Sequence, residues 1–144
     1  MHVGGTLSLD GKITAAGAAP TSKDGGGSGG GVFVTCRAFK PGAGASVSVK
    51  GGNCTAGWAA GGGGGRFALL TGKFTEKDLA ALYETGACPC TSIVCGDLAD
   101  DATSPWPGLV NAAEGASSGT AAVTATRGTA IWARRTSGTR IILK

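Results

Sequence analysis

Five cysteines are the most reactive side chains of this chain, and three of them lie close together as Cys88-Pro-Cys90 and Cys95. Thiolates bind Zn²⁺, but a structural zinc site needs four ligands, and the single histidine, His2, stands at the far end of the sequence. The spacing therefore favours disulfides in an oxidising compartment, or buried thiols, over a metal site. Because five is an odd number, at least one thiol stays unpaired within the chain. The disulfide candidates are Cys36, Cys54, Cys88, Cys90 and Cys95.

One acidic cluster, formed by Asp97, Asp100 and Asp101, has residue types that catalyse glycoside hydrolysis. Such hydrolases use two carboxylates about 5 to 9 Å apart. Asp97 and Asp101 are four residues apart and would share one face of a helix. The same oxygens are also ligands for Ca²⁺. No supporting motif accompanies the cluster, so the sequence favours a solvated acidic loop over a catalytic or calcium site.

A second candidate site is basic and aromatic, with Trp132 followed by Arg134 and Arg135. Indole rings stack on ligands and guanidinium groups bind acidic polymers, so these three residues are candidates for ligand binding. The competing interpretation, which we favour, is a strand whose Ile131 faces the core and whose other residues are surface residues. Three apolar side chains on the outward face then form a candidate self-association surface: Phe33, Trp132 and Ile142.

Composition limits the classes of function. Glycine makes up 28 of 144 residues and only 15% of residues are charged, which favours an extracellular β-structure over a cytosolic enzyme. The net charge of +4 is too small to indicate nucleic-acid binding. No apolar run reaches the roughly 20 residues that cross a bilayer. The glycine-rich stretches fit neither a phosphate-binding loop nor a serine nucleophile elbow.

The elements that must position these side chains follow from a repeat. An alternating segment, a glycine run and a strand-like segment occur twice, about 40 residues apart, and Leu7 in the first copy corresponds to Val47 in the second. A flexible linker is the alternative for the first glycine run, but its recurrence favours a place inside each repeat. The repeat predicts stacked short strands. The copies are Thr6 to Gly17, Gly25 to Gly31 and Val32 to Val34, then Ser46 to Gly57, Gly61 to Gly65 and Arg66 to Leu70.

One helix interrupts the β pattern. Thr75 is a good N-cap, Asp78 stands three residues later in place of the Glu of a capping box, and Gly86 is a natural stop. We therefore expect a helix from Glu76 to Thr85. A lid or partner helix is one interpretation, and a helix that covers an open end or side of the β-structure is the one we favour.

These segments resemble the repeats of large glycine-rich surface proteins. The resemblance is carried by LDGKITAAG (9–17), GGGSGGGVFV (25–34) and GGGGGRFALL (61–70), and covers roughly Val3 to Gly72. It implies a right-handed parallel β-helix, similar to the pectin-lyase-like and autotransporter-adhesin-like folds. It implies no reaction.

We therefore expect one all-β domain over residues 1–144, a β-solenoid with one short helix at 76–85. Residues 1–72 would carry the repeats, 73–119 the helix and an irregular cysteine-containing insertion, and 120–144 the returning strands. The expected function is a non-catalytic structural or adhesive module, extracellular or at the cell surface. The alternatives are a β-helix that binds or cleaves carbohydrate and a self-assembling filament subunit. Expected partners are the chain itself or an acidic polysaccharide. We expect no cofactor, and Ca²⁺ is the one alternative.

Overall fold

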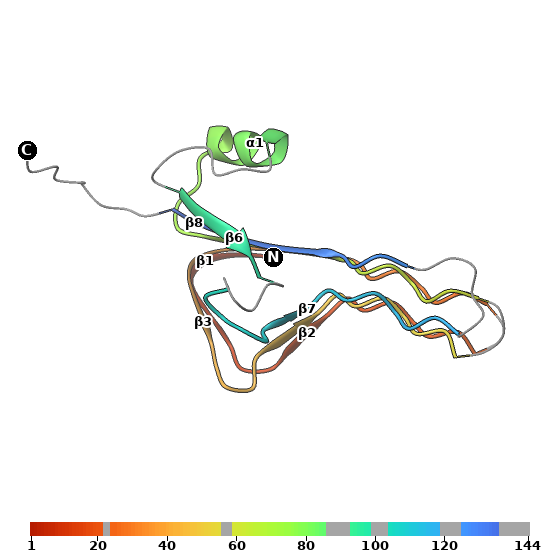
Figure 1. Cartoon of the computed structure of the whole chain (residues 1–144). Coiled ribbons are helices and arrows are strands. Elements are labelled where there is room, and N and C mark those ends of the chain that lie inside the picture. Colours follow the sequence, from red (N-terminus) through yellow and green to blue (C-terminus); the bar gives the residue numbers. More distant parts are fainter. Residues whose placement is uncertain (22–23, 56–58, 86–92, 99–103, 119–124, 136–144) are drawn as a thin grey trace, which may run out of the picture.

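The computed structural model describes residues 1–21, 24–55, 59–85, 93–98, 104–118 and 125–135. The chain is mostly β-structure with one short helix, and nearly all strand pairs are parallel (Figure 1). The first sheet has the order β1-β3-β5-β8-β6, and the second has the order β2-β4-β7. The bounds are β1 His2–Leu9, β2 Lys12–Thr14, β3 Gly31–Pro41, β4 Ser46–Ser48, β5 Arg66–Thr71, α1 Glu76–Thr85, β6 Ile93–Asp97, β7 Val110–Asn111 and β8 Thr129–Arg135.

The chain follows the same path three times, and we call each round a pass. A pass begins with a strand of the first sheet, continues with a strand of the second, runs outward through a glycine- or alanine-rich segment and returns through another (Figure 1). In the third pass α1 and β6 lie between the two strands, and β8 follows the last return. The passes are β1, β2, 15–21 and 24–30; β3, β4, 49–55 and 59–65; and β5, β7, 112–118 and 125–128.

The register between passes differs in part from the sequence repeat. Ile13 pairs with Val47, and Val47 pairs with Val110, whereas Leu7 pairs with Phe39. The predicted match of Leu7 with Val47 is therefore wrong in register. Alternating segments resemble one another in sequence, and only the backbone pairing shows which residues are partners. Both residues nevertheless contribute to one core, since Leu7 packs against the buried cluster that contains Val47. The glycine runs were matched correctly, since the strands after them pair Val32–Val34 with Phe67–Leu69.

The core lies between the facing sides of the two sheets. Val47, Phe67 and Leu69 are almost fully buried there. Trp132 pairs with Leu69 and packs against this core, while Ile131 is 49% exposed. The expected orientation of β8 was therefore wrong by one residue, and a shift of one residue in a strand exchanges its two faces.

The outward face of the first sheet carries Phe33, which is 41% exposed, as the alternation predicts. Ile131 lies on the same face, since both residues pair with Ala68. Trp132 is not part of this face, and Ile142 lies outside the described residues. The predicted apolar surface of Phe33, Trp132 and Ile142 is thus incorrect in its Trp132 member.

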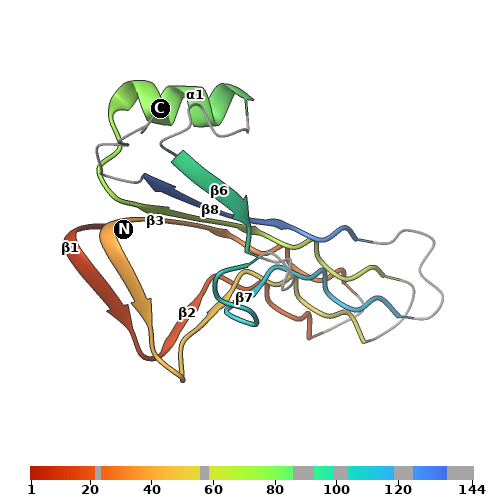
Figure 2. The same ribbon diagram turned by 60° about the vertical axis from the view of Figure 1, so that its left-hand side comes forward.

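The outward and returning segments form two layers that project away from the sheets (Figure 2). Within the returning layer, Gly26 N–H donates to the carbonyl of Ala60 (2.9 Å), and Gly29 N–H donates to that of Gly63 (2.9 Å). Donors and acceptors are therefore both spaced by three residues. The oligoglycine runs are ordered parts of the passes and do not serve as a linker.

Hydrogen bonds between the two layers have the same spacing. Gly62 N–H donates to Gly52 (2.9 Å) and Gly65 N–H donates to Val49 (2.7 Å). Three residues per turn is the period of the polyproline II helix, which has no internal hydrogen bonds and leaves every peptide group for its neighbours. We name these two layers the glycine bundle.

Close approach, not backbone conformation, requires the glycines of this bundle. Among the described residues only Gly72 and Gly108 have positive φ angles, and both lie outside it. A Cβ atom on Gly62 would overlap the backbone carbonyl of Gly27 in the neighbouring segment. A Cβ on the adjacent Gly63 would lie 3.7 Å from the nearest backbone oxygen, an ordinary contact distance.

This difference between neighbours gives a direct prediction. Gly62→Ala should lower the free energy of unfolding by about 3 kcal/mol, because two backbones must move apart. Gly63→Ala should change it by less than about 1 kcal/mol, and a slight gain is expected from the less flexible unfolded chain. Urea unfolding followed by circular dichroism measures both. Equal effects of the two substitutions would contradict the close-packed bundle.

Candidate functional site

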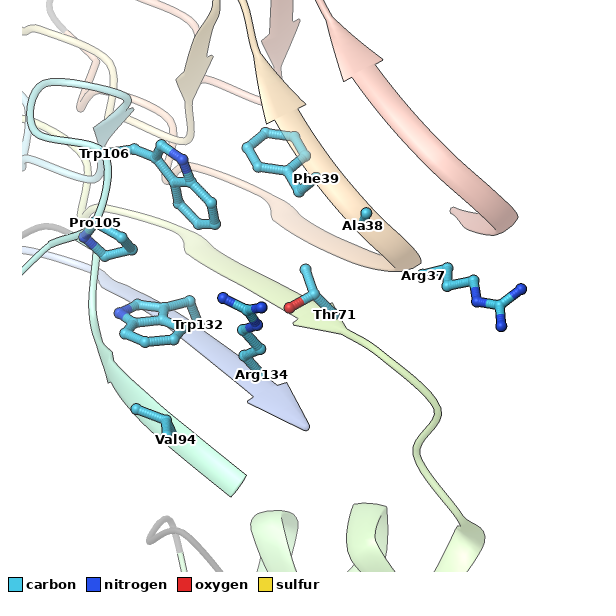
Figure 3. Close-up of a pocket in the computed structure, with 9 residues that line it drawn as sticks. All are labelled: Arg37, Ala38, Phe39, Thr71, Val94, Pro105, Trp106, Trp132 and Arg134. Atoms are coloured by element: carbon cyan, nitrogen blue, oxygen red, sulfur yellow. The ribbon is translucent and has the colours of Figure 1, made fainter. Parts of the chain in front are cut away.

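A pocket of about 350 Å³ lies where the second half of β3 and the ends of β5 and β8 meet a short turn (Figure 3). Parallel strands bring their carboxyl ends to one side of a sheet, so residues far apart in sequence meet there. Three aromatic rings and two guanidinium groups give this pocket its character. Its lining residues are Arg37, Ala38, Phe39, Thr71, Val94, Pro105, Trp106, Trp132 and Arg134.

The aromatic rings form a connected edge-to-face series. Phe39 and Trp106 have ring centroids 5.1 Å apart at an interplanar angle of 82°. Trp106 and Trp132 follow at 6.5 Å and 70°. Such arrangements are favourable because the positive edge of one ring faces the negative face of the next. The series fixes the aromatic side of the pocket.

A turn places Trp106 over the strands. The hydroxyl of the buried Ser104 accepts a hydrogen bond from the Trp106 backbone N–H (3.1 Å), and Leu109 N–H donates to the Trp106 carbonyl (3.2 Å). Gly108 has a φ of 73°, which favours glycine. Figure 3 shows Trp106 approaching from the side opposite β8, so the turn closes one wall.

Trp132 is held more deeply. Its Nε1 atom is buried and has no hydrogen-bond partner among the described residues. It lies against Gly96 of β6, where an added Cβ would be 2.8 Å from this nitrogen. Gly96 pairs with Trp132 across the β6–β8 ladder, so glycine there makes room for the indole.

The charge of the pocket is positive. Arg37 and Arg134 are exposed, and none of the lining residues is acidic. In Figure 3 the Arg134 guanidinium stands beside Trp132, while Arg37 extends outward at the other end of the pocket. Trp132 and Arg134, both predicted ligand-binding candidates, are therefore brought together by the fold.

Arg135, the third predicted member, is elsewhere. It forms an ion pair with Asp78, at the start of α1. Asp78 also accepts hydrogen bonds from the backbone N–H and the hydroxyl of Thr75 (both 2.8 Å), and its own N–H donates to that hydroxyl (3.2 Å). This is the predicted capping interaction, at the predicted start of the helix. Hydrogen bonds from Thr75 hold the pKa of Asp78 below its ordinary value, and the backbone N–H has a larger effect than the hydroxyl. The charge of Arg135 lowers this pKa further.

The acidic candidates do not meet in the described structure. Asp97 is exposed at the end of β6 and pairs with Ile131, so it does not line the pocket. Asp100 and Asp101 lie outside the described residues. Within the described part of the chain no three His, Cys, Asp or Glu side chains gather into a metal site. A calcium site that involves Asp100 and Asp101 stays a prediction.

Two cysteine predictions need correction. Cys36 and Cys54 are buried thiols, although both were disulfide candidates. Cys36 faces the core from β3, whereas Cys54 lies in the glycine bundle and donates to the Asp24 carbonyl (3.4 Å), so different parts of the fold hold them. Cys95 packs beside Leu70 and Ala133. Cys95 is disulfide-bonded, as predicted, while Cys88 and Cys90 lie outside the described residues.

Among the aromatic and basic residues of the pocket, sequence reasoning missed three, namely Arg37, Phe39 and Trp106. Trp106 had a usable signal, since a tryptophan between two prolines in a short turn presents a large ring on a rigid backbone. Arg37 and Phe39 had none, because only the pairing of β3 with β5 and β8 brings them near Trp132.

Comparisons with protein-family models, curated proteins and solved structures find no match to this chain. In the described part of the chain, no helix has the length and apolar character needed to cross a membrane.

The helix cap predicts a pH dependence of stability. Folding lowers the pKa of Asp78, so its contribution is fully present above the unfolded pKa, about 3.8, and is lost as the pH falls through the folded value. Asp78→Asn should therefore destabilise the protein at pH 7 and have a smaller effect below pH 3.8. Chemical unfolding across this pH range measures the difference. Glu84→Gln, at an exposed acid of the same helix, is the control, and an Asp78→Asn effect that grows in acid would contradict the assignment.

The thiols predict a pattern of chemical labelling. Burial raises the pKa of the Cys36 thiol, with a smaller opposite effect of the Leu7 backbone hydrogen bond, so little reactive thiolate is present. Cys36 and Cys54 should resist iodoacetamide in the folded protein at pH 8 and react after denaturation. Peptide mass spectrometry locates the label. A disulfide between these two residues, or rapid native labelling, would contradict the structure.

Proposed function

We propose that this chain is an extracellular adhesive module, a right-handed parallel β-helix that binds an acidic saccharide in the pocket of Trp106, Trp132 and Arg134. The β-helix is supported by three passes that stack in parallel and share one core. The binding function is supported by one observation above all: indole rings and an exposed guanidinium line the same pocket. The chain would display this pocket at a cell surface or in an extracellular matrix.

The two kinds of lining group recognise two parts of one ligand. Indole rings offer apolar faces and edges to the C–H groups of a sugar ring. A guanidinium offers paired N–H donors that match a carboxylate or sulfate. Because the described lining holds two arginines and no acid, an anionic sugar gains attraction that a neutral sugar lacks.

Binding is a better fit than cleavage. Hydrolysis by paired carboxylates needs two acids beside the scissile bond. The described lining of the pocket holds none, and Asp97 lies on the opposite face of β6 from Val94, which does line it. We therefore propose recognition without bond cleavage.

The glycine bundle supports an adhesive role. It projects away from the sheets as a slab of hydrogen-bonded backbone (Figure 2), with small side chains and few charges. Such a slab is a stiff spacer, because many of its peptide groups are held by the backbone of a neighbouring segment.

A binding experiment tests the proposal. A heparin-derived tetrasaccharide and a tetragalacturonate should bind by isothermal titration calorimetry, while neutral cellotetraose should bind at least tenfold more weakly. Arg134→Gln should weaken binding of the anionic sugars at least tenfold, because it removes a charge that faces the ligand. Trp106→Ala should weaken it similarly by removing the stacking surface.

The matched control is Arg66→Gln, because Arg66 is exposed at the opposite end of β5 and lies outside the pocket. It should leave affinity unchanged within twofold. Added salt should weaken binding by the unmodified protein more than binding by Arg134→Gln. Equal binding of neutral and anionic sugars, or equal losses in Arg66→Gln and Arg134→Gln, would overturn the proposal.

A further inference from the structure

In the part of the chain that the structure describes, one edge of the fold is open. β1 and β2 are the outermost strands at the same end of the two sheets, and the glycine-rich segments of the first pass continue this edge into the bundle. An exposed edge offers peptide groups to another chain, and many proteins protect such edges with charged side chains. Residues 14–21 and 25–30, at this edge, contain no charged residue.

Within each layer of the bundle, the hydrogen bonds between passes run in one direction. In the outward layer Ala15 N–H donates to Ser48 and Gly17 N–H donates to Lys50 in the second pass (both 2.8 Å). The returning layer repeats this direction, as the bond from Gly26 to Ala60 shows. Within a layer, each pass thus donates N–H groups to the next one. Between the layers, Gly52 N–H and Gly115 N–H donate back to the carbonyls of Gly27 and Gly62 in the preceding pass (both 2.8 Å).

The first pass consequently presents carbonyl groups at its free side. The second-pass acceptors Lys50, Ala60 and Gly63 correspond to Ala16, Gly25 and Ser28 by the register of the adjoining strands. No described residue donates a hydrogen bond to the carbonyls of these three residues. Within each layer, the free edge is therefore a row of acceptors of known spacing.

The opposite end of the first sheet is closed. β6 pairs antiparallel with β8 and ends the series of parallel strands, and α1 lies beside these two strands (Figure 1). A second copy therefore cannot continue the parallel ladder from that end. Two copies joined at the bundle layers of their first passes would place carbonyls against carbonyls, which cannot hydrogen-bond. The first sheet therefore cannot continue into a filament of parallel strands.

We propose that the first-pass edge docks one further glycine-rich pass of a partner polypeptide. The partner would run parallel to residues 15–30 and present N–H groups as Gly26 and Gly29 present theirs to the second pass. Its inward residues must be glycine, because the bundle leaves no room for a Cβ at the equivalent close contacts, such as Gly26 against Gly52. The chain would then end a stack of passes and not extend it.

The experiment uses a ¹⁵N-labelled peptide with the sequence of residues 2–34 as the partner. Mixed with the unlabelled full chain, its amides at the positions of Gly26 and Gly29 should exchange with solvent at least tenfold more slowly than in the free peptide. Ala16→Lys and Ser28→Lys, at exposed residues of the edge, should abolish this protection. Ala116→Lys, at an exposed residue of the third pass, should leave it intact.

A tethered version removes the entropic cost of association. In one polypeptide, an extra copy of residues 1–34 is placed directly before His2. This junction is chosen because His2 pairs with Thr35, the residue that follows the same segment in the native sequence. The added pass should resist proteolysis. Ala16→Lys in the original pass should abolish this resistance, whereas the same substitution in the added pass should leave it intact. Protection in either experiment with this mutational pattern supports the proposal. No protection in the mixture together with a protease-sensitive added pass would overturn it.

Discussion

Direct contact between backbones is the constraint on which this structure depends. In the glycine bundle the peptide groups of adjacent passes bond across a gap too narrow for a methyl group, as the contact of Gly62 with Gly27 shows. Each buried peptide group must find a partner, and here the partner is another segment of backbone. Register, direction and spacing of the passes are consequently set together. The strands that continue from the bundle inherit this parallel order.

The parallel order explains where the pocket lies. β3, β5 and β8 run in the same direction, so Arg37, Thr71 and Arg134 come near one another although they are far apart in sequence. The insertion between β5 and β7 then supplies what the passes cannot, namely Trp106 as a wall and β6 as the end of the sheet. The repeating part builds a scaffold, and the irregular part gives it a site.

Local signals in the sequence were sufficient for several elements. The helix from Glu76 to Thr85 follows from Thr75 and Asp78, because a cap is made by residues three positions apart. Strand alternation identified Phe33 as an outward-facing residue. The recurrence of the glycine runs indicated a structural role, which the hydrogen bonds of Gly26 and Gly29 confirm.

The sequence could not show how segments that are far apart in the chain pair and pack with each other. Alternation has a period of two, so it could not distinguish Ile13 from Leu7 as the partner of Val47, nor the two faces of β8. Trp132 was assigned to the surface because nothing in β8 indicates that Leu69 lies beside it. The sequence indicated that Arg135 shares the ligand-binding role of Arg134. Arg135 instead forms an ion pair with Asp78, and this contact depends on where the helix lies.

The glycine bundle also has a thermal consequence. Exposure of hydrocarbon on unfolding raises the heat capacity, whereas exposure of peptide groups lowers it. Unfolding of the glycine bundle exposes mainly peptide groups, whereas unfolding of the sheets exposes the hydrocarbon of Phe67, Leu69 and their neighbours. The two parts of one small chain therefore have stability curves of different curvature, and cooling, which weakens hydrophobic burial, acts mainly on the sheets and spares the bundle.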